Sequence, residues 1–477
     1  MIHKNFIANQ WVSALAGQTL PVINPSDGQM YAEIARSGEA DIDVAVRAAR
    51  DAFEGRWGRM APAERSRLLF RLAMALLDHQ DELAAIESRD TGKPMKQARA
   101  DAAAIARYFE FYAGAADKLH GSTIPYPNEF TVLTVREAHG VTGHIVPWNY
   151  PLQIFGRSVA ASLAVGNACV VKPAEDACLS LLKVAEIAAE VGLPPGALNI
   201  CTGLGAEAGA ALSAHPGVDH MSFTGSPQTG KQVALAAAGH FAPVTLELGG
   251  KSPQILFSDA DLDAAMPVVL NAIIQNAGQT CSAGSRVLIQ RAIYSDVIGR
   301  LSELFQATRT GAASDDPDVG PLINARQLER VQAYIQQARE SGIEQAAVGQ
   351  RDLNAPAGGF YQAPVVFTNV PPDHPLAQEE IFGPVLCAIP FDTEDEALRI
   401  ANGTPFSLVA GLWTTDGARQ MRLARRVKAG QVFVNNYGAA GGVELPFGGT
   451  GQSGYGKEKG FEALYGFTTL KTIAVRH

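Results

Sequence analysis

Apolar residues in the first quarter of the chain recur at three- and four-residue spacing, the pattern of amphipathic helices. The predicted helices cover residues 41–53, about 63–89 and about 95–119. A polar stretch over residues 121–130 then leads into an alternating, β-branched run over 131–139. Because strict alternation places every second side chain on one face, this run predicts an exposed strand.

Short apolar runs and helical segments alternate from residue 141 onward. The strand-like runs are 141–147, 168–173, 197–201, 220–224 and 244–248. Helical segments such as 179–191 and 228–238 fall between them. This alternation predicts an α/β fold with a mainly parallel sheet. Ligands bind such sheets beyond the carboxyl ends of the strands, where the connecting loops gather.

A second α/β region begins at about Lys251. It includes a predicted helix over 262–275, a strand over 286–290, and the segment PLAQEEIFGPV at 375–385. The tail over 467–476 again has the pattern of a strand. A terminal strand needs a partner, and another subunit would supply one.

Composition narrows the class of protein. The 477 residues predict two or three domains, and the net charge of −9 comes without a basic stripe, which argues against nucleic acid. No apolar run approaches the ~20 residues that span a bilayer. The five cysteines form no CxxC pair, so neither a disulfide framework nor a metal site is predicted. We therefore expect a cytoplasmic protein that binds no membrane.

Cys281 is the candidate nucleophile, in the segment NAGQTCSAGSR at 276–286. Its neighbours are small or polar, which leaves room for a partly exposed thiol with hydrogen-bond donors nearby. The alternative is a buried, inert cysteine. That alternative is our interpretation of the four cysteines in apolar runs, Cys169, Cys178, Cys201 and Cys387.

Two further residues could assist a nucleophile. Glu247, in VTLELGGKSP, ends a strand-like run and could serve as a general base, or it could be a strand-end carboxylate held by backbone amides. Asn149, in IVPWNYP, could donate its side-chain amide to an oxyanion, or it could simply be a turn residue before Pro151.

Two loops could bind a nucleotide. Lys172 and Glu175 follow a predicted strand and could hold ribose hydroxyls, with a solvated surface pair as the alternative. The segment from Gly225 to Lys231 matches GxxxxGK, but Gln232 stands where a P-loop needs Ser or Thr for magnesium. A glycine turn before a helix still suits a pyrophosphate without metal.

Taken together and in this order, these segments resemble the aldehyde dehydrogenase superfamily. The segments that carry the resemblance are PWNYP, VVKPAE, FTGS, LELGGKSP, GQTCSAGSR, EEIFGPV and PFGGTGQSGYGKEKG, between residues 147 and 460. The resemblance implies two Rossmann-like parallel-sheet domains and a small β oligomerisation arm in a homodimer or homotetramer. The implied boundaries are 1–119 with 139–249 for the dinucleotide-binding domain, 250–460 for the catalytic domain, and 120–138 with 461–477 for the arm.

The resemblance also implies a reaction in which an aldehyde becomes a carboxylic acid. Cys281 attacks the aldehyde to give a thiohemiacetal, while the Asn149 amide and the Cys281 backbone N–H hold the oxyanion. Hydride transfer to the cofactor leaves a thioester, which water hydrolyses with Glu247 as the base. Lys172 is expected to contribute both to catalysis and to cofactor binding.

The expected cofactor is NAD, because the Glu175 carboxylate would repel the 2′-phosphate of NADP, which stays as the alternative. By the resemblance, Lys172 and Glu175 contact the adenosine ribose and Gly225 and Ser226 the pyrophosphate. The remaining expected cofactor-binding residues are Trp148, Gly205, Glu380 and Phe382.

Substrate choice is expected to depend on a tunnel around Cys281. Its predicted lining residues are Tyr150, Gln153, Arg157, Gln275, Thr280 and Ser282. NYPLQ and ELPFGG resemble the betaine-aldehyde and aminoaldehyde branch, but Arg157 would repel a cation and resembles the succinate-semialdehyde branch instead. Arginine suits a carboxylate, so a semialdehyde with a polar or acidic tail is favoured. In the alternative, Arg157 pairs with a protein acid, and the substrate is a neutral aliphatic or aromatic aldehyde or an amino or betaine aldehyde.

Three other functions compete with this hypothesis. A CoA-acylating enzyme would not need Glu247 as a hydrolytic base. A non-catalytic binding protein on this fold would be expected to lack Cys281, Glu247 or Asn149, yet all three are present. A nucleotide triphosphatase would need Ser or Thr in place of Gln232.

Overall fold

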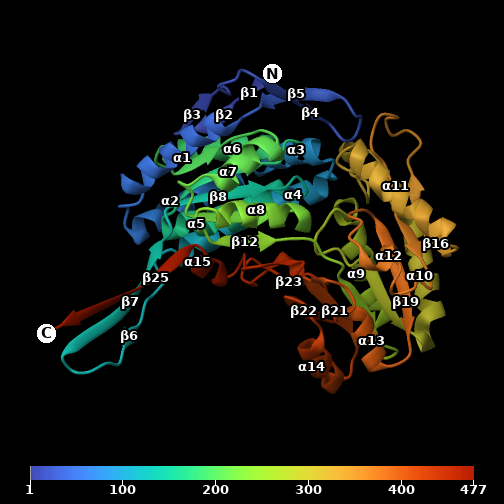
Figure 1. Ribbon diagram of the computed structural model, residues 1–477. Coiled ribbons are helices and arrows are strands. Elements are labelled where there is room, and N and C mark those ends of the chain that lie inside the picture. The colour runs from blue at the N-terminus through green and yellow to red at the C-terminus, as the bar shows by residue number, and fades with distance from the viewer. Residues whose placement is uncertain (1) are drawn as a thin grey trace.

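The computed structural model describes residues 2–477 and consists of two sheet-centred domains and a projecting arm (Figure 1). The first sheet has eight strands in the order β24-β12-β11-β8-β9-β10-β2-β3. Its central strands run parallel: β8 (Val141–Val146), β9 (Ala168–Pro173), β10 (Leu198–Ile200), β11 (His220–Thr224) and β12 (Val244–Glu247). Its edge strands run antiparallel: β2 (Asn5–Ile7), β3 (Gln10–Val12) and β24 (Gly454–Tyr455).

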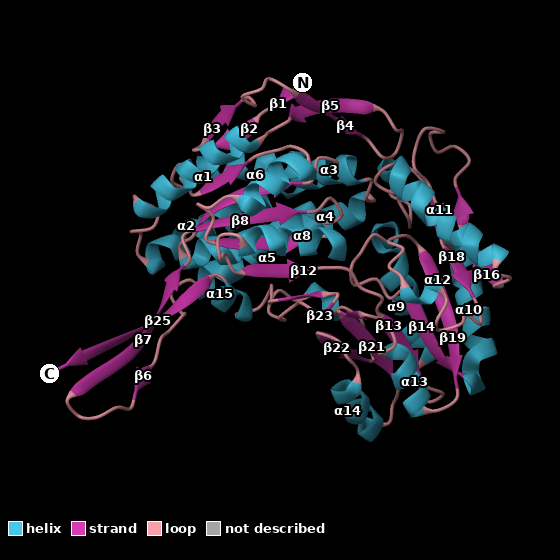
Figure 2. Ribbon diagram, in the orientation of Figure 1, coloured by secondary structure: helices cyan, strands magenta, loops and turns pink. Residues whose placement is uncertain are grey.

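Helices pack around this first sheet (Figure 2). They are α1 (Glu39–Glu54), α2 (Pro62–Asp78), α3 (Gln80–Thr91), α4 (Met95–Ala115), α5 (Pro151–Val165), α6 (Leu179–Glu190), α7 (Ala210–Ala214) and α8 (Pro227–Ala238). The single helix predicted over about 63–89 is wrong, because the chain breaks at His79 (φ −95°, ψ 14°) and forms α2 and α3. The apolar spacing continues across the break, so periodicity alone could not locate it.

The N-terminal segment forms strands that the hydrophobic pattern did not indicate. Besides β2 and β3 these are β1 (Ile2–His3), β4 (Thr19–Ile23) and β5 (Met30–Ala35), which form a three-stranded sheet in the order β1-β5-β4. Two- to six-residue strands are too short to show a clear alternation.

The second sheet has seven strands in the order β16-β18-β19-β14-β13-β21-β22, parallel except for β16. The strands are β13 (Pro253–Leu256), β14 (Arg286–Gln290), β16 (Gln345–Val348), β18 (Val365–Phe367), β19 (Val385–Phe391), β21 (Val409–Trp413) and β22 (Gln431–Val434). The helices of this domain are α9 (Leu262–Ile274), α10 (Tyr294–Ala307), α11 (Ala325–Glu340), α12 (Pro375–Gln378), α13 (Glu394–Ala401) and α14 (Gly417–Arg426).

The arm consists of β6 (Thr123–Ile124), β7 (Phe130–Ala138) and the C-terminal β25 (Thr468–Arg476). β25 pairs antiparallel with β7 along its whole length, from Thr468 opposite Ala138 to Arg476 opposite Phe130. The arm projects away from both domains (Figure 1). The sequence predicted β7 and β25. β25 enters the arm from α15 (Glu462–Gly466), which packs against α5.

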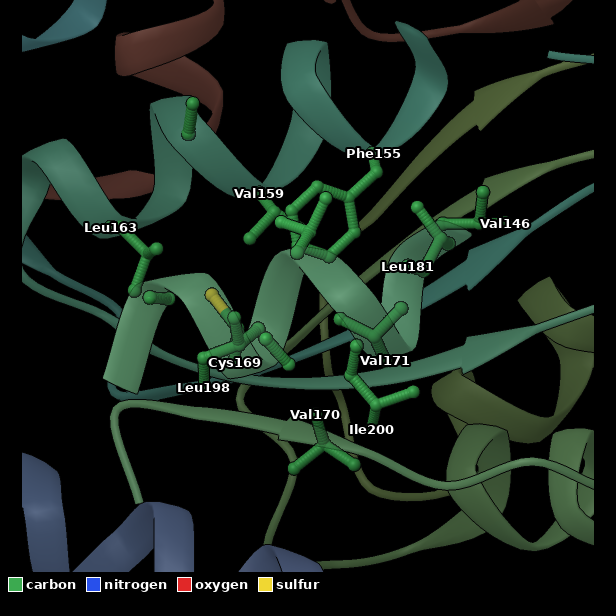
Figure 3. Packing of buried hydrophobic residues seen from close by; sticks show 14 of the residues in the cluster. Val146, Phe155, Val159, Leu163, Cys169, Val170, Val171, Leu181, Leu198 and Ile200 are labelled. Carbon is green, nitrogen blue, oxygen red and sulfur yellow. The ribbon is translucent and has the colours of Figure 1, made fainter. Parts of the chain in front are cut away.

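The core of the first domain fixes the sheet edge from which the motif loops emerge. Phe155 and Val159 of α5 pack with Val146, Val171 and other buried residues of the parallel strands (Figure 3). Because β8, β9, β11 and β12 are parallel and adjacent, the loops after all four leave from the same edge.

The α/β fold class with two parallel-sheet domains and a β arm is confirmed. The domain boundaries stay predictions, and one segment crosses them: β24, inside the range 250–460, pairs with β12 of the first sheet. No helix within residues 2–477 has the length and apolar character needed to cross a membrane.

Candidate active site

Most of the residues predicted to act together lie at or just beyond the carboxyl ends of strands. Asn149 lies between β8 and α5, Lys172 is the second-last residue of β9, and Gly225 follows β11. Glu247 is the last residue of β12, and Cys281 lies between α9 and β14 of the second domain. The candidate site therefore forms where loops of both domains meet.

A cavity of about 320 Å³ opens at this place, and both Cys281 and Asn149 line it. The six residues predicted from the sequence as the substrate tunnel line it as well: Tyr150, Gln153, Arg157, Gln275, Thr280 and Ser282. Aromatic side chains that sequence reasoning did not single out complete the wall, among them Tyr108, Phe433, Tyr437 and Phe447. The cavity is thus large enough for a small organic molecule and has a mixed polar and aromatic surface.

Cys281 stands at the end of a left-handed turn. Asn276, Ala277 and Gly278 have φ values of 49°, 54° and 72°, a conformation that non-glycine residues adopt at a cost. A Cβ at Gly278 would lie 2.3 Å from the carbonyl carbon of Gly383, so only glycine fits. This turn ends the helix that would otherwise carry the chain past the cavity.

Two hydrogen bonds join this turn to Asn149. The Asn149 amide donates to the Gln279 carbonyl at 2.9 Å, and the Asn276 amide donates to the Asn149 carbonyl at 2.8 Å. Since an amide nitrogen carries two hydrogens, one of those on Asn149 stays free for a group in the cavity. Asn276 and Gln279 lie in the cysteine motif, but nothing in their spacing indicated this contact.

Among the five cysteines, all of which are described, only Cys281 is partly exposed. Burial nevertheless raises the pKa of its thiol to about 12, against the opposing effect of the nearby Arg157 guanidinium. The thiol is therefore protonated at neutral pH in this arrangement. Nucleophilic attack by Cys281 requires a proton acceptor or a positive charge brought close to the sulfur.

Glu247 is not among the residues that line the cavity. It is 1% exposed, and neither carboxylate oxygen has a hydrogen-bond partner within residues 2–477. A Cβ on Gly448 would lie 2.5 Å from its Oε1. Burial and the Glu458 carboxylate raise the pKa of Glu247 well above its usual value, and Arg157 and Lys457 oppose them. Glu247 is thus a base of raised pKa that is not among the residues lining the cavity with Cys281.

Arg157 lines the cavity but forms an ion pair with Glu458, and both side chains are buried. Its guanidinium carbon lies 4.9 Å from the centre of the Phe447 ring. Glu458 also accepts a hydrogen bond from the Ser222 hydroxyl at 3.0 Å. The alternative considered for Arg157, a pair with a protein acid, is therefore the arrangement observed. Glu458 lies in the GYGKEKG segment and was not singled out from the sequence.

A buried polar cluster supports the wall formed by Tyr150 and Gln153. The Tyr150 hydroxyl shares a hydrogen bond of 2.9 Å with the Thr280 hydroxyl, and the Lys93 ammonium lies 4.0 Å from the Tyr150 ring centre. The Gln153 amide donates to Asp101 at 2.5 Å. Lys93 in turn pairs with Asp101 and Glu87, so helices α3 and α4 fix the orientation of both wall residues.

The predicted nucleotide-binding residues lie at the carboxyl edge of the first sheet. Lys172 and Glu175 form an ion pair of 2.9 Å. Gly225 donates its N–H to the Glu247 carbonyl at 3.0 Å, and the Ser226 hydroxyl caps α8 by accepting from the Thr229 N–H at 3.2 Å. A capped helix start with further free amides suits an anion such as a pyrophosphate.

The second part of the predicted cofactor site lies close to the cysteine loop. Glu380 accepts a hydrogen bond from the Gly250 N–H at 3.0 Å, and burial raises its pKa to about 7. Phe382 has a φ of 61° and meets Trp148 edge to face at 5.4 Å between ring centres. Gly205 has open space around it, which leaves its role a prediction.

Comparison with known proteins gives one consistent result. Residues 11–473 match the family model described as "Aldehyde dehydrogenase family". A hydroxyisobutyraldehyde dehydrogenase of Mycolicibacterium austroafricanum is 41% identical over 480 residues, covering 98% of this chain and 93% of the relative.

Solved structures agree. A Burkholderia cenocepacia chain is 68% identical, with a TM-score of 0.99 over 99% of this chain and 100% of that one. The NAD⁺ complex of an aldehyde dehydrogenase from Bacillus cereus is 40% identical, with a TM-score of 0.96 over 100% of this chain and 97% of that one. The resemblance inferred from the motifs is thereby confirmed, and the chain belongs to the aldehyde dehydrogenase family.

Proposed function

We propose that this enzyme oxidises an aldehyde to the carboxylic acid with NAD, through a covalent intermediate on Cys281. The observation that carries the proposal is the shared cavity: it is lined by the one partly exposed cysteine and by an asparagine with a free amide hydrogen. A thiol and an oxyanion donor on one small cavity are the parts that acyl chemistry at a carbonyl requires.

In this mechanism the Cys281 thiol releases its proton to water, which the nearby positive charge of Arg157 favours, and the sulfur attacks the aldehyde carbon to give a thiohemiacetal. The Asn149 amide and the Cys281 backbone N–H hold the oxygen that gains negative charge, and each such donor is typically worth about 10²–10³ in rate. Oxidation of the thiohemiacetal leaves a thioester on Cys281. Glu247 then deprotonates the water that releases the acid, for which its side chain turns from Gly448 toward the cavity.

The residues at the edge of the first sheet fit NAD. Lys172 and Glu175 would hold the adenosine ribose, the turn at Gly225 and Ser226 the pyrophosphate, and Glu380 the second ribose. When bound, NAD supplies the acceptor for the hydride that the thiohemiacetal loses. In this arrangement the Glu175 carboxylate would repel the extra phosphate of NADP, and the NAD complex of the B. cereus relative supports the same choice.

The test is NADH formation from simple aldehydes by the wild type and by Cys281→Ala. We expect the variant to lose turnover by at least about a hundredfold while still binding NAD, because the cysteine contributes chemistry and not cofactor affinity. Cys201→Ala, which changes a buried cysteine away from the cavity, is the matched control and should keep its turnover. Turnover retained by Cys281→Ala would refute the covalent route.

Water, not CoA, is the proposed acyl acceptor, because Glu247 is present as a base for hydrolysis. An assay with CoA distinguishes the two: release of free acid at an unchanged rate supports hydrolysis, and formation of acyl-CoA refutes it. We further propose a cytoplasmic homodimer or homotetramer, joined through the arm.

A further inference from the structure

Lys459 is a second cation in the cavity wall, next in sequence to the Glu458 that pairs with Arg157. It is 8% exposed and lines the same cavity as Cys281. Its backbone is left-handed, with a φ of 61°, which is uncommon for lysine. The chain therefore adopts a costly conformation at the residue that places an ammonium group beside the cavity.

The Lys459 ammonium is not neutralised by a carboxylate. It donates one hydrogen bond, to the Gly441 carbonyl at 2.9 Å, and no acidic group of residues 2–477 lies within 4 Å of its nitrogen. An ammonium has three hydrogens to donate, so two remain. Arg157 differs, because Glu458 already compensates its charge.

The location of Lys459 suits contact with the far end of a substrate. Gly441 is exposed and lines the cavity together with Gly438. The Lys459 nitrogen is 5.9 Å from the centre of the Phe447 ring, and the Arg157 guanidinium carbon lies 4.9 Å from the same ring centre. A molecule whose aldehyde carbon reaches Cys281 would extend past Phe447 toward this ammonium.

The surroundings of Lys459 disfavour its positive charge. Burial, and then the Arg157 guanidinium, lower the pKa of Lys459 to about 8, and Glu444 opposes them. The Glu444 carboxylate is itself paired with Arg107, and Glu458 is engaged by Arg157. A buried cation without a counter-ion is costly, and an anionic ligand would remove that cost.

We propose that Lys459 determines substrate specificity by binding the carboxylate at the far end of an acid-tailed aldehyde. The proposal rests on the aldehyde oxidation proposed above and assigns the tail contact to Lys459, not to Arg157. It identifies the substrate class as aldehydes with an anionic group separated from the aldehyde carbon by a short chain.

The test uses aldehydes of increasing chain length, because only a substrate of matching length can place its aldehyde carbon at Cys281 and its carboxylate at Lys459. The substrates are 4-oxobutanoate, 5-oxopentanoate and 6-oxohexanoate, each compared with butanal, pentanal or hexanal. The enzymes are wild type, Lys459→Met and Lys459→Arg; methionine keeps the length without charge, and arginine restores the charge. The measured quantity is the ratio of kcat/KM for the acid-tailed aldehyde to that for the matched alkanal.

We expect Lys459→Met to lower this ratio by about ten- to a hundredfold for the best chain length, since a hydrogen bond to a charged group has that worth. Lys459→Arg should recover most of the ratio. In wild type the ratio should decline above pH 8, as the ammonium loses its proton, and in Lys459→Arg it should stay level. A ratio within twofold of wild type in Lys459→Met at every length would overturn the proposal, as would an equal loss on both substrates.

A binding measurement separates this proposal from the reaction. Calorimetry with glutarate, the acid product of 5-oxopentanoate, needs no turnover. Affinity that is lost in Lys459→Met and recovered in Lys459→Arg supports the tail contact even if no aldehyde is oxidised, in which case only the proposed function fails. Equal glutarate affinity in all three enzymes counts against Lys459.

Discussion

The Glu247 carboxylate has no hydrogen bond within the described chain that would hold it beside Gly448. A side chain without such a bond can turn toward the cavity at little enthalpic cost, which a base that acts only in one step requires. Its raised pKa has a further consequence: the proton is retained until the pH exceeds that pKa, and only the deprotonated form can activate water.

Replacing Glu247 with glutamine therefore separates the two halves of the reaction. Glu247→Gln should still give a rapid burst of NADH equivalent to the enzyme, followed by steady-state turnover lower by about 10²-fold or more, the usual worth of a general base. Rapid-mixing absorbance measures both phases. Wild-type steady-state turnover should rise with pH, and the residual turnover of the variant should not.

Glu303→Gln, on the exposed side of α10, provides the control and should behave as wild type. If the burst itself disappears in Glu247→Gln, then Glu247 acts before the thioester forms, and the assignment to deacylation is incorrect.

At the scale of elements, the left-handed turn between α9 and Cys281 determines the position of the nucleophile. Gly278→Ala would place a methyl group on the Gly383 carbonyl and strain a φ of 72°. We expect it to lower the free energy of unfolding by about 1–3 kcal/mol and to reduce turnover more than tenfold, because Gln279, Thr280 and Cys281 move with the turn. Denaturant unfolding and NADH formation measure the two effects.

Gly299→Ala is the matched control, since nothing lies within 4 Å of the added methyl group in the middle of α10. Alanine is the better helix former by about 1 kcal/mol, so this variant should be at least as stable as wild type. Equal behaviour of the two variants would show that the turn does not constrain the active site.

Elements that belong to the regular alternation of strands and helices were predictable from the sequence, and isolated or interrupted ones were not. β9, β11 and β14 have the predicted bounds, although each is only five or six residues long, because each takes its place in that alternation. The break at His79 and the N-terminal strands carry no comparable signal.

The residues of the candidate site also differ in whether the sequence could predict them. Cys281, Asn149 and the six cavity residues follow from motifs. The contacts of Glu458 and Lys459 depend on which elements the fold brings together. No local pattern shows that Lys459 lines the same cavity as Asn149 and Cys281, or that Glu458 pairs with Arg157.

At the scale of the whole molecule, three histidines lie where the arm joins the first domain. His139 and His220 stack at 5.1 Å, and Phe467, one residue before β25, contacts His220 and His144 at 5.0 and 5.7 Å. Burial lowers the pKa of His144 to about 3 and that of His220 well below its usual value. The folded protein therefore keeps both rings neutral.

Acid should destabilise this junction. Unfolded histidine binds a proton near pH 6.5, whereas folded His144 does so only near pH 3. Between these values the unfolded state binds more protons, and stability falls as the pH is lowered, by about 1.4 kcal/mol per pH unit for each such histidine. Denaturant unfolding between pH 6 and 4 should show this slope, and His144→Gln should reduce it. His120→Gln, at an exposed position, should leave the slope of stability against pH unchanged. An equal slope in wild type, His144→Gln and His120→Gln would refute the explanation.

The arm carries features that support the proposed assembly of subunits. Leu470, Ile473 and Val475 of β25 are 56%, 38% and 47% exposed, an unusual concentration of apolar side chains on a projecting strand. β25 pairs with β7 on one edge only, and β22 is an edge strand of the second sheet, so both present unpaired backbone groups. Joining such edges between subunits would bury these residues and complete both sheets.

Changing Ile473 and Val475 together to lysine should therefore disrupt assembly without unfolding the subunit, because neither residue belongs to a core. Light scattering should show a smaller mass than for wild type, with circular dichroism unchanged. Leu353→Lys, at a position 95% exposed on the main body, controls for added charge and should leave the mass unchanged. If the arm variant keeps the wild-type mass, the subunits associate through another surface and the arm is not the interface.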